Sequence, residues 1–267
     1  MTLSIRLVIS DIDGTLVRTD KTLSDGVIAA AQRLAAGGIA LSLISARPPS
    51  GMLWIAEKLG LTTPIGAFNG GTIVGPDGAI LSADRLDPAL AAKTLELLDV
   101  DGVTPWLFAD GNWYAREIEN RFVPRERRAA NVEPIVLQDF SALLERADKI
   151  VGVSDDHDAL AVLDGKVAEA LGVHATVARS QPYYLDVTAP HANKGDGVTA
   201  LAAALSVPLE QVAVLGDQRN DLPMFARAGR SFAMGQAPDE VRAAASRVMV
   251  SNDEDGVAQA LDEILAG

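Results

Sequence analysis

The segment DIDGTL, residues 11–16, places two carboxylates on either side of one hydrophobic residue. If Asp11 and Asp13 are held 4 Å apart at an effective dielectric constant of 20, their repulsion costs about 4 kcal/mol. A cation is therefore expected beside them, and a hard divalent ion such as Mg²⁺ prefers oxygen ligands. An acidic turn without a ligand is an alternative. An EF-hand loop is less favoured, because its sixth and twelfth positions hold Gly and Glu, whereas here they hold Leu16 and Thr22.

The segment GDQRND, residues 216–221, adds three more oxygen-bearing side chains, those of Asp217, Asn220 and Asp221. It directly follows the apolar run 212–215, which is predicted to be a buried strand. DIDGTL follows a similar apolar run. Because ligands bind at the carboxyl ends of the strands in α/β sheets, both segments are expected at the same edge of one sheet.

Two helix starts are expected to supply positive charge and phosphate-binding groups. Asn193 is predicted to cap a helix, which puts Lys194 at the first position, where the helix dipole disfavours a cation. A lysine placed there favours a role beside an anion, with a solvated lysine as the alternative. Ser45 ends a predicted strand, and its hydroxyl, with the backbone N–H groups of Ala46 and Arg47, would suit a phosphate-binding corner. A simple helix cap would also explain this Ser.

The elements that must position these residues alternate between strands and helices at both ends of the chain. Such alternation indicates a Rossmann-like parallel α/β sheet with right-handed crossovers. Ser24 is a plausible N-cap for the first helix, and Gly37 would end it. The predicted strands cover residues 5–10, 39–45, 212–215 and 247–250, and the helices follow at 24–37, 50–59, 193–205, from 221, and at the C-terminus.

The pattern changes to α+β between residues 84 and 189. A two-residue Asp-Gly turn in 107–114 separates two strand-like arms and predicts a hairpin. Further helices are predicted at 117–130 and 158–171, and strands at 149–153 and 183–187. We therefore predict a catalytic core built from residues 1–83 and 190–267, with an α/β cap inserted at 84–189, rather than two sequential domains.

Composition limits the possible partners. The chain has 267 residues, of which 48% are hydrophobic, and it has no Cys, which rules out disulfides and thiolate metal sites. A formal net charge of −13 would repel nucleic acid and anionic lipid, so neither nucleic acid nor a membrane is expected as a partner. The N-terminus has no signal-peptide pattern, and a cytoplasmic protein is expected.

The four segments, in this order, resemble the motifs of the haloacid dehalogenase superfamily: DIDGTL, Ser45, Lys194 and GDQRND. The position of the expected cap, together with FNGG at 68–71 and AMGQAPDEVRAAA at 233–245, resembles the Cof-like subfamily with its α/β cap of the C2B type. The resemblance covers nearly the whole chain. Gln236 departs from it by standing where relatives usually have Asn, and Ser45-Ala46-Arg47 replaces the commoner Thr-Gly-Arg.

The resemblance implies a Mg²⁺-dependent phosphatase that acts on a small phosphorylated metabolite, with a sugar phosphate as the favoured class. Asp11 would attack phosphorus to form an aspartyl-phosphate, and Asp13 would act as general acid and base. Mg²⁺ would be held by the side chains of Asp11 and Asp217 and the backbone carbonyl of Asp13. The residues implied to bind phosphate are Ser45, Ala46, Arg47, Lys194 and Asn220, and those implied to orient the metal shell and Lys194 are Asn220 and Asp221.

Two alternatives to a phosphatase remain open at this stage. A phosphosugar mutase would return the phosphoryl group from the enzyme to a sugar, and a phospho-ligand-binding protein would keep the fold without catalysis. FMN and pyridoxal phosphate are substrates of a size that also suits such a cap. A monomer or a small homo-oligomer is expected.

Overall fold

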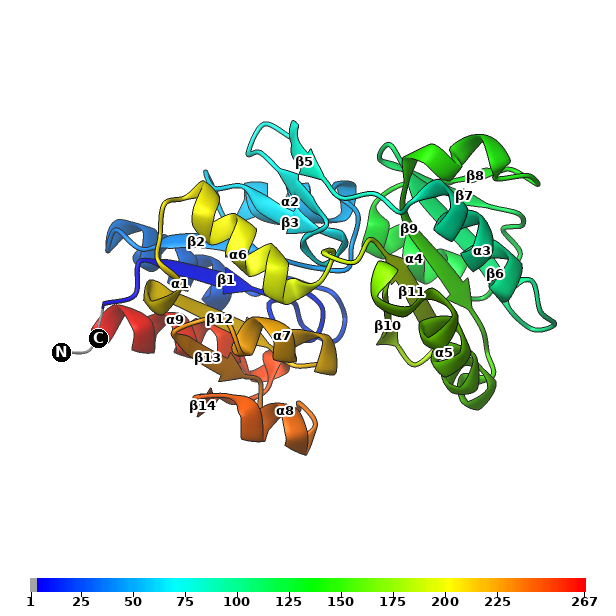
Figure 1. Ribbon diagram of the computed structural model, residues 1–267. Helices are drawn as coiled ribbons and strands as arrows, with labels where there is room; N and C mark the ends of the chain where they lie inside the picture. Colours follow the sequence, from blue (N-terminus) through cyan, green and yellow to red (C-terminus); the bar gives the residue numbers. More distant parts are fainter. Residues whose placement is uncertain (1–3) are drawn as a thin grey trace.

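Two sheets, one parallel and one mixed, lie at opposite ends of the molecule (Figure 1). The computed structural model describes residues 4–267. A smaller three-stranded sheet accompanies the parallel one. This arrangement confirms the predicted fold class, a parallel α/β core with an additional α+β region.

The parallel sheet has the order β14-β13-β12-β1-β2 and draws its strands from both ends of the chain. Its strands are β1 (Leu7–Ser10), β2 (Ala40–Leu43), β12 (Val212–Gly216), β13 (Arg230–Ala233) and β14 (Arg247–Val248). All four residues of β1 are buried, because helices cover both faces. Val8 faces one hydrophobic cluster, whereas Leu7 and Ile9 face another.

The helices around this sheet form two layers. α1 (Asp25–Ala36), α2 (Ser50–Lys58) and α9 (Gly256–Ala266) share one cluster, and α6 (Lys194–Ala204), α7 (Leu222–Phe225) and α8 (Asp239–Ala244) share the other. The Ser24 side chain accepts a hydrogen bond from the N–H of Val27, which confirms the predicted N-cap of α1. Asn193 caps α6 in the same way, by accepting from the N–H of Asp196.

The mixed sheet has the order β10-β11-β9-β6-β7-β8. Its strands are β6 (Thr104–Ala109), β7 (Asn112–Ala115), β8 (Pro134–Val136), β9 (Ala147–Val153), β10 (Thr176–Gln181) and β11 (Tyr184–Thr188). α3 (Pro88–Leu98) and α5 (His157–Leu171) pack on one face. α4 (Val123–Ala130) covers the other face and packs against α2, so this face joins the hydrophobic cluster of the parallel sheet.

Some local predictions are confirmed and others are wrong. The Asp-Gly turn joins β6 to β7, with positive φ at Asp110 and Gly111, as a two-residue hairpin requires. The helix predicted at 117–130 begins only at Val123, because Pro124 is favoured in a first helical turn and disfavoured inside a helix. The helix predicted from residue 221 is only four residues long.

The antiparallel sheet of β3 (Ile65–Ala67), β4 (Thr72–Val74) and β5 (Ile80–Ala83) has no counterpart among the sequence predictions. Its strands are short, and β3 and β4 are fully buried, so neither shows the alternation that reveals a strand. The short turn between β3 and β4 carries Asn69 at φ 60°.

Candidate active site

Three buried carboxylates meet where β1 and β12 end. Asp11, Asp217 and Asp221 each offer an oxygen, and these oxygens lie within 4.8 Å of one another. The parallel pairing of β1 with β12 brings the two acidic segments together, and the N–H of Asp11 donates to the carbonyl of Leu215 at 2.9 Å. The predicted convergence of DIDGTL and GDQRND at one sheet edge is therefore confirmed.

Lys194 enters this cluster from the first turn of α6. Its Nζ lies 2.7 Å from Oδ1 of Asp11 and 2.5 Å from Oδ1 of Asp221. Burial lowers the pKa of Lys194, but the two carboxylates more than offset this, so the pKa is raised overall. The lysine is thus held as a cation against the unfavourable end of the helix dipole.

The cluster carries more negative than positive charge. Three carboxylates and one ammonium leave a formal charge of −2. Burial, with repulsion from Asp221 as a further cause, raises the pKa of Asp217 to about 6 and also raises that of Asp11. The site therefore has the oxygen ligands and the charge deficit that suit a divalent cation.

The backbone turns tightly to bring Asp217 against the DIDGTL loop. Gly14 has φ +81°, and a Cβ there would lie 2.8 Å from Cγ of Asp217. Thr15 Oγ1 donates to Asp217 Oδ1 at 2.9 Å, and Gln218 Nε2 donates to Oδ2 at 3.1 Å. Glycine is required at position 14 for both its conformation and its lack of a side chain.

Both carboxylate oxygens of Asp221 accept hydrogen bonds from other groups of the chain. Its Oδ2 accepts from the backbone N–H groups of Asp217 and Gln218, at 2.7 and 2.8 Å, and its Oδ1 contacts Lys194. The carboxylate thereby fixes both the GDQRND turn and the lysine. This geometry suits an orienting residue better than a metal ligand.

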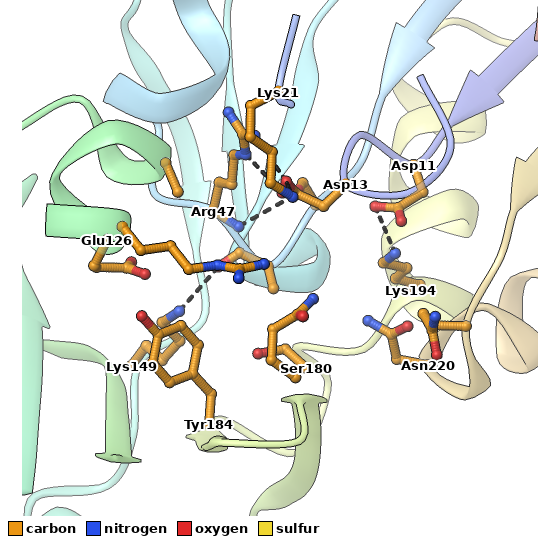
Figure 2. Close-up of a pocket in the computed structure, with 16 residues that line it drawn as sticks. Asp11, Asp13, Lys21, Arg47, Glu126, Lys149, Ser180, Tyr184, Lys194 and Asn220 are labelled. Atoms are coloured by element: carbon orange, nitrogen blue, oxygen red, sulfur yellow. Dashed lines mark hydrogen bonds and ion pairs between the residues drawn. The ribbon is translucent and has the colours of Figure 1, made fainter. Parts of the chain in front are cut away.

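Asp13 lies on the other side of the loop and is paired with two cations (Figure 2). Arg47 donates from Nε and Nη2 to the two oxygens of Asp13, at 2.7 and 2.8 Å, and Lys21 Nζ lies 2.7 Å from Oδ1. Although burial alone would raise the pKa of Asp13, these cations hold it well below its usual range. The side chain of Arg47, predicted to bind phosphate, is thus engaged by a carboxylate.

The remaining predicted residues line one cavity with the acidic cluster. Ser45, Ala46, Arg47 and Asn220 border a cavity of about 70 Å³ that also contacts Asp11, Asp13 and Lys194. A neighbouring cleft of about 680 Å³ shares Lys194 and Asn220 with it. Together they offer room for a phosphate and for an organic group attached to it.

The predicted site residues do not include the side chains that reach the cavity from α4 and from the mixed sheet: Arg125, Glu126, Lys149, Ser180, Gln181 and Tyr184. One signal was present in the sequence, because Lys149 is a charged residue at the start of the apolar strand predicted at 149–153, and the structure buries that strand completely. Lys21, which follows DIDGTL by a few residues, carries no comparable signal. The position of the others depends on how the two sheets pack.

Comparisons with known proteins place the chain in a family. A sequence model of the haloacid dehalogenase-like hydrolases matches residues 8–261. The chain is 29% identical over 239 residues to the HMP-PP phosphatase of Cronobacter sakazakii, with 89% of this chain and 87% of the relative covered. It is 28% identical over 267 residues to the 5-amino-6-(5-phospho-D-ribitylamino)uracil phosphatase YitU of Bacillus subtilis, with 96% of each covered.

The fold agrees with that of a solved member of the same family. A crystal structure of a haloacid dehalogenase-like hydrolase from Bacteroides thetaiotaomicron superposes with a TM-score of 0.87 at 26% identity, with 98% of this chain and 100% of that chain covered. Among residues 4–267, no helix combines the length and apolar character needed to cross a bilayer. We conclude that the chain is a phosphatase that belongs to the haloacid dehalogenase-like hydrolases.

Proposed function

We propose that the protein is a Mg²⁺-dependent phosphatase that hydrolyses a phosphate monoester of a small metabolite, a sugar phosphate, through a phosphoryl group carried on Asp11. The proposal depends on one observation, the buried acidic cluster that faces Lys194 at the ends of two parallel strands. The names of the relatives support the substrate size, since the YitU relative is named for a phosphorylated small molecule.

The acidic cluster fits the metal. Asp221 already accepts hydrogen bonds from Lys194 and two backbone N–H groups, so the side chains of Asp11 and Asp217 are the better ligands, with the backbone carbonyl of Asp13. When bound, Mg²⁺ would neutralise the charge that otherwise keeps a carboxylate away from a phosphate. Thr15 and Gln218 orient Asp217 for this purpose.

Asp11 is the nucleophile in this proposal. Its carboxylate oxygen forms a bond to phosphorus while the ester P–O bond breaks, and water later cleaves the aspartyl-phosphate. Lys194 and Ser45 would hold the transferring oxygens, with the amide of Asn220 beside them. Fixed charges of this kind stabilise the transition state without reorganisation during the reaction.

Asp13 would transfer the protons. It would first give a proton to the leaving alkoxide and then take one from the water that attacks the aspartyl-phosphate. The ion pairs with Arg47 and Lys21 keep Asp13 ionised, which suits the second step. For the first step, the substrate phosphate would draw Arg47 away from Asp13, so that the carboxyl can take up a proton.

The mixed sheet with its helices would act as a cap over the site. We propose the boundaries expected from the sequence, with the cap at 84–189 and the core at 1–83 and 190–267. Lys149 of the mixed sheet donates to the carbonyl of Ala46, at 3.0 Å, beside the proposed phosphate site. Such a contact would help to exclude bulk water during phosphoryl transfer.

The experiment is phosphate release from a panel of sugar phosphates, with Mg²⁺ or with excess EDTA. Asp11→Asn and metal removal are each expected to abolish turnover, because the amide is a poor nucleophile and the uncompensated carboxylates repel phosphate. Asp101→Asn, an exposed position outside the site, serves as the matched control. Activity that survives in Asp11→Asn, or a phosphorus NMR spectrum with an isomerised sugar phosphate in place of free phosphate, would contradict the proposal.

A further inference from the structure

The turn between β3 and β4 is the FNGG segment, residues 68–71, which has no part in the proposed reaction. Three successive residues have a left-handed backbone, with φ of 49° at Phe68, 60° at Asn69 and 92° at Gly70. Gly and, less readily, Asn adopt this conformation, whereas a bulky residue such as Phe rarely does. Both Phe68 and Asn69 are buried. Such strain persists only where the surrounding structure holds it, and it is frequent at functional sites.

The backbone N–H groups of this turn bind the corner that is proposed to hold phosphate. The N–H of Asn69 donates to the carbonyl of Ser45 at 2.7 Å, and the N–H of Phe68 donates to the carbonyl of Arg47 at 3.0 Å. A lysine of β9 holds the carbonyl of Ala46 between them. All three carbonyl oxygens of the corner, which would repel an anion, are thus occupied by donors from other segments. This leaves the Ser45 hydroxyl and the N–H groups of Ala46 and Arg47 as the groups suited to a phosphate.

The same turn packs directly on α6, the helix that carries Lys194. Gly197 lies one turn after Lys194 in this helix. A Cβ on Gly197 would lie 2.8 Å from Cα of Gly70 and 3.1 Å from the carbonyl oxygen of Asn69, and a Cβ on Gly70 would overlap Cα of Gly197. Because backbone meets backbone here, no flexible side chain can absorb a shift. The turn therefore fixes the separation between α6 and the Ser45 corner.

Asn69 makes its contact with the corner through its main chain. Its side-chain Oδ1 accepts no hydrogen bond from residues 4–267, whereas its N–H forms the bond to Ser45. Asn suits the position because it tolerates positive φ better than other residues that carry a side chain. The structure thus separates two possible roles of Asn69, the backbone conformation that it permits and a contact made by its amide.

We propose that residues 68–70 are a positioning element that holds the Ser45 corner and the Lys194 helix at a fixed separation, so that both bind the same phosphate. Asn69 is its central residue, because it supplies the N–H that binds Ser45 and the left-handed backbone that directs this N–H. The element acts on the phosphate through Ser45 and Lys194. This inference rests on the proposed function, which places the phosphate beside these two groups.

The test titrates inorganic phosphate into the protein in the presence of Mg²⁺ and compares Asn69→Ala with Asn69→Gly. Ala tolerates positive φ poorly, so in Asn69→Ala the turn is expected to relax and the phosphate Kd to rise by about 10- to 100-fold. Gly adopts positive φ readily, so Asn69→Gly is expected to bind phosphate within about threefold of the wild type. The same pattern is expected in kcat/KM for a sugar phosphate. Wild-type affinity in Asn69→Ala would overturn the proposal, and so would equal losses in Asn69→Ala and Asn69→Gly, which would assign the role to the amide.

Gly197→Ala tests the contact from the side of α6 and leaves the turn itself unchanged. Ala favours a helix more than Gly does, so the substitution does not weaken α6. Its Cβ would press on Gly70 and Asn69 and separate the helix from the turn, so phosphate affinity is expected to fall by about 10-fold or more. Unchanged affinity would refute the link between the turn and α6.

Controls separate positioning from stability and from the proposed function. Gly60→Ala introduces the same backbone strain, at φ +66°, where a Cβ meets nothing within 4 Å, so it should lower the unfolding temperature and keep phosphate affinity. A role of Asn69 confined to stability would give that same result in Asn69→Ala. If the wild type hydrolyses phosphate esters and the Asn69 variants match it in phosphate Kd and kcat/KM, this inference alone is refuted. If the wild type with Mg²⁺ hydrolyses no phosphate ester and binds no phosphate, the proposed function is refuted as well.

Discussion

The contact between α2 and α4 offers a direct test of how the mixed sheet covers the site. Gly51 lies in the first turn of α2, against the last residues of α4. A Cβ at position 51 would overlap the carbonyl oxygen of Ala129 and would lie 3.2 Å from the Ala129 carbonyl carbon and from Cα of Ala130. The neighbouring atoms are backbone, and Ser50 Oγ also donates to the Ala130 carbonyl at 2.6 Å, so local rotation cannot relieve the overlap.

The size of the effect follows from these distances. Carbon atoms pack best at about 3.5–4.0 Å, and the Ala129 carbonyl oxygen lies nearer to the added Cβ than either carbon, so Gly51→Ala forces α4 to retreat by roughly 1 Å. Overpacking of this kind costs about 1–3 kcal/mol. Because Glu126 and Arg125 of α4 border the cavity, the same shift is expected to lower kcat/KM by about 10- to 100-fold, as a displacement of 1 Å can do.

The assay measures kcat/KM for a sugar phosphate and the free energy of unfolding in urea. Gly165→Ala is the matched control, since a Cβ on this exposed glycine of α5 meets nothing within 4 Å. That control should gain about 0.5–1 kcal/mol of stability and keep full activity. If the Gly51→Ala variant kept the activity and stability of the wild type, the inference that α2 and α4 are in close contact in the active enzyme would be refuted.

Further predictions concern the metal cluster and the buried ion pair. Gly14→Ala places a Cβ against the Asp217 carboxylate at φ +81°, so Mg²⁺ affinity measured by calorimetry should fall by about 10- to 100-fold; unaltered affinity would show that the contact is not rigid. Lys149→Met removes the one cation within 4.0 Å of Asp186 among residues 4–267, and it should cost about 3–5 kcal/mol of unfolding free energy. Adding Asp186→Asn to that variant should recover much of the loss in urea titrations, and a double variant no more stable than Lys149→Met would count against the pairing. The pKa of Asp217, about 6 in the folded protein against an ordinary 3.8, lies above its unfolded value, so folding favours the protonated form. Metal-free wild type should therefore lose about 3 kcal/mol relative to Asp217→Asn as pH rises from well below 3.8 to well above 6. Urea midpoints with and without Mg²⁺ would check this, and a pH-independent difference without metal would contradict it.

The parts of the site that lie at strand ends could be predicted from the sequence. Buried strands directly before DIDGTL and GDQRND, and the parallel topology that the alternation implies, bring Asp11 and Asp217 together. Lys194 could be predicted because Asn193 marks the start of its helix. These inferences depend on local patterns and on a topological rule, and both are visible in one sequence.

Other features depend on packing between distant segments, which one sequence does not reveal. The pairing of Arg47 with Asp13 could not be anticipated, because a strand-to-helix loop gives no sign of where a long side chain will point. Glu126 and Tyr184 reach the cavity only because α4 packs on α2 and the mixed sheet lies against the core. The error at 117–130 was avoidable, since Pro124 already marks a helix start.

The parallel sheet has a consequence for the order of folding during synthesis. β1 pairs with β12 as well as with β2, so β1 gains neighbours on both sides only after the segment that contains Val212 has been synthesised. The mixed sheet, by contrast, is complete once residue 188 has left the ribosome. We therefore expect the middle of the nascent chain to become compact first, while the edge of β1 stays open to misassembly until the last quarter of the chain emerges.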